Sequence, residues 1–187
     1  MKQTSRPLLV FLDTEFTSES DPHLISIGLA TEDGRTFYAE FSDGWHVESC
    51  SEFVVKNVLP LLKGGTHAEK REKVGRRLAS WLGGLSRRVR IAGDQGISVD
   101  WPLMLELLKR RKPANLCASP LELFSLDYPE FEDIIREEQE KRSDDPNHHH
   151  ALHDAQALEN IWEIYETNLT PNELESLIMG SDQIQGK

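Results

Sequence analysis

The sequence contains few cysteines and no long apolar segment. Its 187 residues include only Cys50 and Cys117, in unrelated contexts, so neither a disulfide framework nor a cysteine-rich metal site is expected. We expect two free thiols in a reducing compartment. The apolar run at residues 8–12 is far too short to span a bilayer, and no apolar signal-peptide core follows the first residues. A cytoplasmic chain without a membrane partner is therefore expected.

Basic residues are also scarce. There are 21 Lys and Arg against 32 Asp and Glu, a net charge of -11, which taken alone argues against a polyanionic partner. The charge is segregated, however: residues 63–112 contain 13 basic and 5 acidic side chains, and the rest of the chain 8 and 27. Each basic cluster is most simply a solvated helix face. Together they could also form a phosphate-contacting surface.

The order of predicted elements indicates one mixed α/β domain. An antiparallel meander of three strands comes first, with a turn at Asp33-Gly34. Helices and short strands then alternate. The strands are predicted at 8–16, 24–30, 35–41, 89–93 and 121–126, and the helices at 53–62, 67–82, 100–111, 129–141, 150–167 and 170–179.

Asp13 and Glu15 lie at the end of the first predicted strand. Side chains two residues apart on a strand share a face, so these carboxylates project together and repel each other. A divalent cation between them relieves the repulsion, and oxygen ligands suit Mg²⁺ or Mn²⁺. The alternative is a strand end that frays into solvent.

A second cluster of possible ligands occurs at residues 148–155. His149 and Asp154 would lie about 140° apart on one helix. His149 can still reach over a site from the entry loop while Asp154, one turn into the helix, binds the ion. The pairs His149–His153 and His150–Asp154 have the i, i+4 spacing of zinc ligands. An exposed, His-rich helix start is the simplest alternative.

Asp100 follows a strand and a loop. An aspartate at this place is ordinary helix-capping chemistry, and Pro102 supports Asp100 or Trp101 as the cap. Only its combination with the other two clusters suggests a functional role.

Asp13, Glu15, Asp100 and Asp154, with His149 five residues before the last, resemble in order and spacing the DEDDh class of 3′–5′ exonucleases. That class includes ribonuclease T, oligoribonuclease and polymerase proofreading subunits. The motifs span residues 13–154. The resemblance implies an α/β, ribonuclease H-like mixed sheet flanked by helices. It also implies one exonuclease domain at 1–168, with a helical extension and frayed tail at 169–187.

The resemblance also implies a mechanism. The four carboxylates would hold two divalent cations, Mg²⁺ or Mn²⁺, about 4 Å apart astride the scissile phosphate. His149 would accept a proton from the attacking water, and nucleoside 5′-monophosphates would leave from a 3′ end. Phe16 would face the terminal base, and Thr14 and Trp101 are the other candidate substrate contacts. Core packing explains Phe16 at least as well, and it is favoured for Trp101 because this residue is next to a helix start.

The middle motif departs from the family pattern. Members carry Asn and Phe just before the second aspartate, whereas Val99 precedes Asp100 here, which leaves Asp94 as a substitute or supporting carboxylate. The expected partners are single-stranded RNA or DNA 3′ ends, with RNA favoured by similarity to small ribonuclease T-like exoribonucleases, and a second copy in a homodimer. The open alternatives are a DNA-directed exonuclease, a catalytically impaired nucleic-acid-binding module, and a His-rich zinc or nickel protein.

Overall fold

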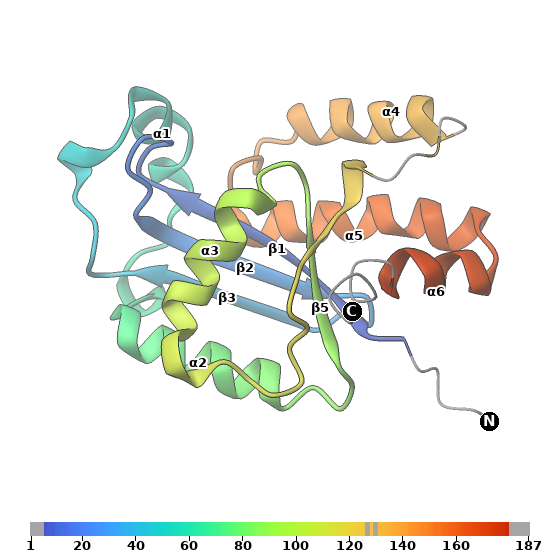
Figure 1. The fold of residues 1–187 in the computed structure, drawn as a ribbon. Helices are drawn as coiled ribbons and strands as arrows, with labels where there is room; N and C mark the ends of the chain where they lie inside the picture. Colours follow the sequence, from blue (N-terminus) through green and yellow to red (C-terminus); the bar gives the residue numbers. More distant parts are fainter. Residues whose placement is uncertain (1–5, 126–127, 129–130, 180–187) are drawn as a thin grey trace.

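The computed structural model describes residues 6–125, 128 and 131–179. A six-stranded mixed sheet forms its centre, with helices on both faces (Figure 1). The strands are β1 Leu8–Phe16, β2 Leu24–Thr31, β3 Thr36–Phe41, β4 Ala68–Glu69, β5 Val89–Gly93 and β6 Leu121–Glu122. The helices are α1 Glu52–Asn57, α2 Arg71–Gly83, α3 Ile97–Leu108, α4 Glu132–Ser143, α5 Ala151–Asn168 and α6 Pro171–Met179.

The strand order is β4-β3-β2-β1-β5-β6. β1, β2 and β3 form the predicted antiparallel meander, and Gly34 takes a positive φ of 82° in the turn between β2 and β3. β5 pairs in parallel with β1 and β6 with β5, while β4 pairs in parallel with β3 at the other edge. The predicted mixed α/β sheet is confirmed.

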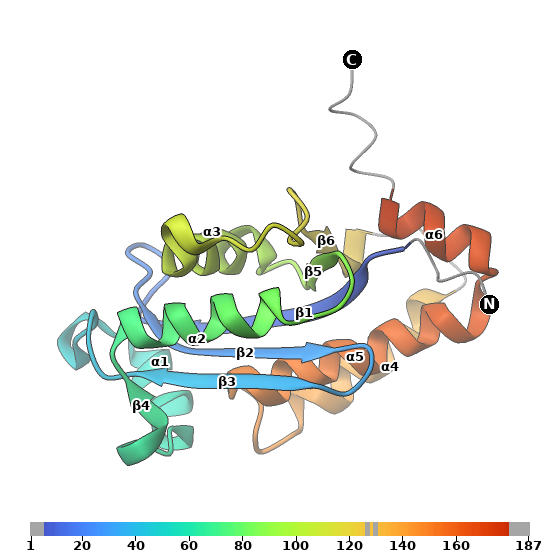
Figure 2. The same ribbon diagram turned by 90° about the horizontal axis from the view of Figure 1, so that it is seen from below.

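Alternation along β1 assigns each of its side chains to one face of the sheet. Leu8, Val10 and Leu12 pack into the core under α2 and α3. Leu9 and Phe11 join the opposite core, under α5 and α6. Figure 2 shows the sheet nearly edge-on, with α3 on one side and α4 and α5 on the other. By the same alternation, residues 13 and 15 of β1 belong to the α5 face and residue 14 to the α3 face.

The prediction of a helix from residue 67 was wrong at its start. A 3₁₀ turn at Gly65–His67 and strand β4 come first, and α2 begins only at Arg71. The carboxylate of Asp43 accepts the backbone N–H of Arg71 at 2.7 Å, and β4 is held by its pairing with β3. Both contacts are tertiary, so local sequence gave no sign of them.

Other boundaries also shift. The predicted helix at 53–62 divides into α1 and a 3₁₀ turn at Leu59–Leu61, because Pro60 cannot donate the next helical hydrogen bond. β6 covers only two residues of the segment predicted as strand 121–126, and a 3₁₀ turn at Leu123–Ser125 follows it. α4 begins at Glu132 and ends two residues after the predicted helix at 129–141.

The C-terminal helix α6 packs on the hydrophobic core of the α5 side. Leu174 and Ile178 belong to the same hydrophobic cluster as Leu158 and Trp162 of α5. The predicted frayed end at 180–187 lies outside the described residues. No helix in the described part of the chain has both the length and the apolar composition that crossing a membrane requires.

Candidate active site

Two carboxylates lie side by side at the end of β1. Asp13 and Glu15 project on the α5 face of the sheet, and Glu15 is only 9% exposed. Burial, followed by the charge of Glu15 and the other cleft carboxylates, raises the pKa of Asp13 well above its ordinary value. Burial and the charges of Asp154 and Asp100 raise the pKa of Glu15 to about 9. Such a cluster favours a proton or a metal cation.

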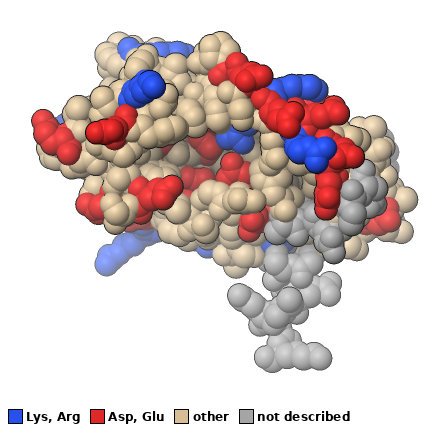
Figure 3. Space-filling view, turned by 90° about the horizontal axis from the view of Figure 1, so that it is seen from above, with Lys and Arg blue, Asp and Glu red and all other residues tan. Residues whose placement is uncertain are grey.

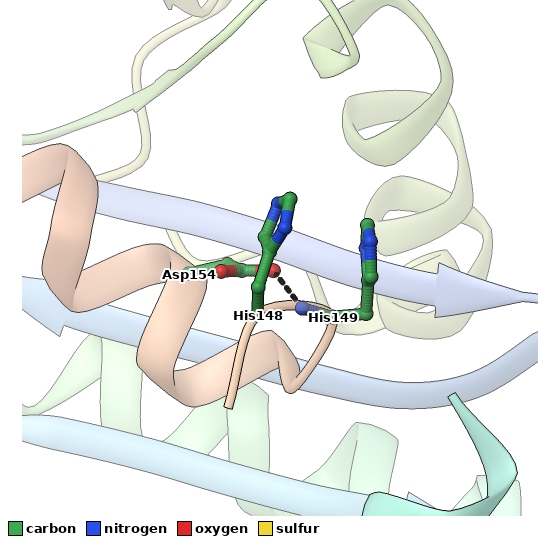
Figure 4. A group of neighbouring side chains, drawn as sticks. All are labelled: His148, His149 and Asp154. Carbon is green, nitrogen blue, oxygen red and sulfur yellow. Dashed lines mark hydrogen bonds between the residues drawn. The ribbon is translucent and has the colours of Figure 1, made fainter. Parts of the chain in front are cut away.

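The start of α5 brings Asp154 next to this pair. Asp154 is buried in the first turn of α5, where the helix dipole favours negative charge. Its carboxylate also holds the preceding loop, since Oδ2 accepts the backbone N–H of His149 at 2.9 Å (Figure 4). His149 has a φ of 74°, a strained conformation for a residue with a Cβ. The bond to Asp154 therefore helps to fix the position of His149.

His149 faces the cleft among aromatic neighbours. Its ring stacks on His148 with centroids 3.8 Å apart, and Phe53 of α1 meets it edge-on at 4.8 Å. Burial and, secondarily, His148 lower the pKa of His149. The neutral imidazole, which can accept a proton, is therefore favoured at neutral pH.

Gly28 allows α5 to approach the sheet this closely. It lies in β2 directly opposite Asp13, and a Cβ built on it would be 2.3 Å from the carbonyl carbon of Ala151. A side chain at this position would displace the start of α5 and with it Asp154. A strand glycine that admits a neighbouring backbone is a recurrent device.

Asp100 reaches the cleft from the other face of the sheet. Thr14 points to that face and donates its hydroxyl to Asp100 Oδ1 at 2.5 Å. Burial raises the pKa of Asp100 to about 7, although the hydrogen bond from Thr14 lowers it. The predicted capping role is wrong: α3 begins at Ile97 with Gly96 as its N-cap, so Asp100 lies within the helix.

Asp94 also belongs to the site. It follows β5, lines the cleft, and accepts the backbone N–H of Gly96 through Oδ1 at 2.7 Å. Its Oδ2 lies 3.4 Å from a guanidinium nitrogen of Arg142. Arg142 is also 3.3 Å from Asp154 and 3.7 Å from Asp13. One arginine thus joins three carboxylates that come from different elements.

These side chains line an open cleft of about 690 Å³. Figure 3 looks into the molecule from above and shows acidic side chains within the hollow. Among the residues that the structure describes, two groups of ligand atoms lie close enough together to hold a metal ion: Asp13, Glu15 and Asp154, and separately His148, His149 and Asp154. Asp100 shares the cleft and is electrostatically coupled to Asp13 and Glu15 but belongs to neither group.

The remaining predicted residues lie in different places. Phe16 lines the cleft and is half-buried. Trp101 is partly buried against the α2–α3 core, near the Lys112 ammonium, and is not among the lining residues of the described chain. His150 turns away from the cleft and stacks on Tyr38. The i, i+4 histidine pairs do not form a ligand group among the described residues.

The basic segment at residues 63–112 does not supply the cleft with cations. Among the residues that the structure describes, its lysines and arginines are absent from the lining. Many are paired with acidic side chains, such as Arg77 with Glu69 and Arg111 with Glu72. Arg142 is the one basic residue of the described lining other than histidine, and it belongs to the acidic part of the chain.

Sequence reasoning gave no role to Arg142, which lines the cleft, or to Phe53, which contacts His149. Arg142 lay beyond the predicted end of its helix, in a run dominated by glutamate. Phe53 looked like a core position of an amphipathic helix, yet it is 52% exposed. His148 belongs to the predicted ligand cluster at residues 148–155, and it lines the cleft.

No protein-family description matches this chain, and no curated protein is similar to it in sequence. Solved structures do share its fold. Pop2p of S. pombe, in a form with bound Mg²⁺ and Mn²⁺, superposes with a TM-score of 0.60 at 14% identity, over 92% of this chain and 88% of Pop2p. Exonuclease I of E. coli bound to a dT13 oligonucleotide gives a TM-score of 0.57 at 14% identity, over 87% of this chain and 41% of exonuclease I.

A zinc-bound complex of E. coli exonuclease I with single-stranded DNA aligns equally well. Because the alignments cover only 41% of exonuclease I, the present chain spans less than half of its length. At these identities the comparisons establish the fold, a ribonuclease H-like α/β sheet with flanking helices.

Proposed function

We propose that this protein is a metal-dependent 3′–5′ exonuclease of the DEDDh type. The observation that carries the proposal is the convergence of four buried or nearly buried carboxylates and one histidine in a single cleft. They come from three separate parts of the chain and are Asp13, Glu15, Asp100, Asp154 and His149. The fold shared with Pop2p and exonuclease I supports the same class of reaction.

The chemistry of the donor set fits divalent cations. Carboxylate oxygens of Asp13, Glu15 and Asp154 lie within 4.8 Å of one another, and their mutual repulsion favours a bound cation. Oxygen ligands suit Mg²⁺ or Mn²⁺, the ions that Pop2p binds in its solved form. Asp100 would complete a set for two ions. When bound, two such ions would supply activation of a water molecule and stabilisation of the departing 3′ oxygen.

The protein's own residues would position the substrate and move the proton. His149, kept neutral by its lowered pKa, would accept the proton of the attacking water at a ring nitrogen. Glu15 would orient that water from the floor of the cleft. Phe16 in the lining and exposed Phe53 beside His149 offer rings for stacking on bases, a contact worth about 1–3 kcal/mol per base.

The proposed substrates are single-stranded 3′ ends, from which nucleoside 5′-monophosphates would be released. RNA is the proposed preference, on the resemblance to small exoribonucleases, and DNA is the alternative. Because the distinction depends on a contact with the 2′-hydroxyl, matched oligonucleotides are needed to decide it.

The test is a digest of matched RNA and DNA oligomers, labelled at the 5′ or the 3′ end, with Mg²⁺ or Mn²⁺. A 5′-labelled ladder that shortens one nucleotide at a time, with mononucleotides released from the 3′ label, is expected. Asp13→Asn should abolish this activity in a folded protein. Asp133→Asn, at an exposed position of α4, is the matched control. Full activity of Asp13→Asn would overturn the proposal.

A second candidate is a nucleic-acid-binding module of the same fold without catalysis. Arg142 favours it, because a guanidinium already neutralises carboxylates that the ions would need. This candidate predicts oligonucleotide binding without product, and any metal-dependent release of mononucleotides that Asp13→Asn abolishes would eliminate it.

A further inference from the structure

Arg142 occupies the space between the carboxylates of the cleft. It lies at the C-terminal end of α4, and its side chain is only 14% exposed. The Nε group donates to Asp154 Oδ1 at 3.3 Å, and the two terminal nitrogens approach Asp13 and Asp94. A largely buried guanidinium is stabilised by anionic partners, and Arg142 has three.

Two of these partners are also candidate metal ligands. Asp13 and Asp154 both belong to the group of oxygens, together with Glu15, that could hold a divalent ion. An ion held by these oxygens would occupy the space toward which the guanidinium points. Cation binding should therefore weaken the contacts of Arg142 with Asp13 and Asp154, and these contacts should weaken cation binding to the same extent.

Asp94 is the partner that remains when the ions bind. It lies outside both ligand groups, and its Oδ1 is already held by the backbone N–H of Gly96. Its Oδ2 faces Arg142 at 3.4 Å. This bond can keep the guanidinium at the edge of the cleft after Asp13 and Asp154 are taken, with other N–H groups free to donate.

We propose that Arg142 is the phosphate-contacting cation of this cleft. In the metal-free protein it neutralises Asp13 and Asp154. When divalent cations take those carboxylates, Arg142 stays on Asp94 and donates to a backbone phosphate of the bound nucleic-acid strand. Two observations favour a phosphate as its new partner: Arg142 is the one lysine or arginine in the described lining of the cleft, and guanidinium groups match phosphate geometry. The inference rests on the proposed nuclease function.

The first measurement is a calorimetric titration of the protein with Mn²⁺ in the absence of substrate. Arg142→Met removes the competing charge and should tighten Mn²⁺ binding by about fivefold or more, the lower end of typical coupling. Arg142→Lys should remain close to the original protein. Arg136→Met, at an exposed position of the same helix paired with Asp133, should change nothing. Unchanged Mn²⁺ affinity in a folded Arg142→Met variant would overturn the proposal that Arg142 and the cations compete for Asp13 and Asp154.

The second measurement is binding of a short single strand with a non-hydrolysable 3′ linkage, in Mn²⁺, over a range of salt concentrations. Arg142→Met should weaken oligonucleotide binding. It should also make the negative slope of log K, the association constant, against log salt shallower by about 0.7, the contribution of one phosphate contact. Arg142→Lys should keep the slope. An unaltered slope in Arg142→Met would overturn the phosphate contact.

Asp94→Asn tests whether Asp94 holds the guanidinium of Arg142 or instead binds a metal ion. It should weaken oligonucleotide binding without weakening Mn²⁺ binding. A loss of Mn²⁺ affinity would show that Asp94 is a metal ligand and would overturn its role in holding Arg142. The two proposals fail separately. Absence of mononucleotide release from the original protein would refute the exonuclease, while the Mn²⁺ titration would still decide whether Arg142 competes with the ions.

Discussion

The two sides of the sheet each contain a glycine that permits an unusually close contact, but the contacts differ in what they position. On the α2–α3 side, a Cβ at Gly75 would lie 2.6 Å from the carbonyl oxygen of Leu107, and the residues brought together are apolar. On the α5 side, the contact of Gly28 with Ala151 places the start of α5 beside Asp13. One contact serves packing, and the other sets the position of charged groups.

The two sides also differ in the unfavourable electrostatic interactions that they contain. The α2–α3 side packs Leu78, Leu82, Met104 and Leu108 into an apolar core, and the carboxyl of Asp100, in α3, is directed into the cleft. On the α4–α5 side of β1, carboxylates with raised pKa values are held together by packing and by Arg142. Such frustration is expected at a functional site.

Exchanging the two glycines for alanine should give the largest difference between the sides. Gly28→Ala must displace the start of α5, and a misplacement of about 1 Å can lower activity by about 100-fold. We expect this loss in kcat/KM for a short oligonucleotide, together with weaker Mn²⁺ binding.

Gly75→Ala is the matched control. Overpacking between α2 and α3 should cost about 1–3 kcal/mol of unfolding free energy, with kcat/KM nearly unchanged. If both variants lose activity equally, or if Gly28→Ala retains it, the two contacts do not differ as argued.

Removal of metal should destabilise the α5 side in a pH-dependent manner. Because the pKa of Glu15 is raised from 4.5 to about 9, the folded metal-free protein holds a proton that the unfolded chain releases between these values. The free energy of unfolding should therefore fall as pH rises from about 5 to about 9. Thermal unfolding in EDTA across this range measures the fall.

Two comparisons sharpen this measurement. Glu15→Gln should flatten the pH dependence in EDTA, and added Mg²⁺ should raise the melting temperature most at high pH. A metal-free protein whose stability rises over the same range would contradict the proposed cause.

The sequence predicted the strand-borne part of this arrangement well. A period of two in β1 is enough to place Asp13 and Glu15 together, and the hairpin turn at Asp33-Gly34 is set by local chemistry. The position of Asp154 relative to β1 depends instead on Gly28, a residue distant in sequence whose only contribution is the absence of a side chain. Arg142 could not be found because its role depends on three partners from separate elements.

Removing the hydrogen bond between Thr14 of β1 and Asp100 of α3 should have a more moderate effect on metal binding. Thr14 faces α3 and donates to Asp100, which lowers the pKa of that carboxyl. Thr14→Val keeps the shape and removes the donor, a bond to a charged group worth about 1.5–3 kcal/mol. Mn²⁺ binding at pH 7 should weaken by about tenfold and should recover above about pH 9, where Asp100 of the variant is ionised.

Thr31→Val is the control for this variant, because the hydroxyl of Thr31 donates to Asp33 in the hairpin turn, outside the cleft lining. It should leave Mn²⁺ binding unchanged at every pH. A loss that does not depend on pH in Thr14→Val would show that Thr14 acts through packing alone.

The smallest effect is expected from the basic residues of the α2–α3 side. Arg77 and Arg111 are paired with Glu69 and Glu72 and do not line the cleft. Replacing both with alanine should leave the salt slope of oligonucleotide binding unchanged, although two phosphate contacts would have contributed about 1.4. A drop of that size would restore the basic segment as a phosphate-contacting surface. An unchanged slope, set beside the loss expected for Arg142→Met, would place the phosphate contact on a residue from the acidic part of the chain.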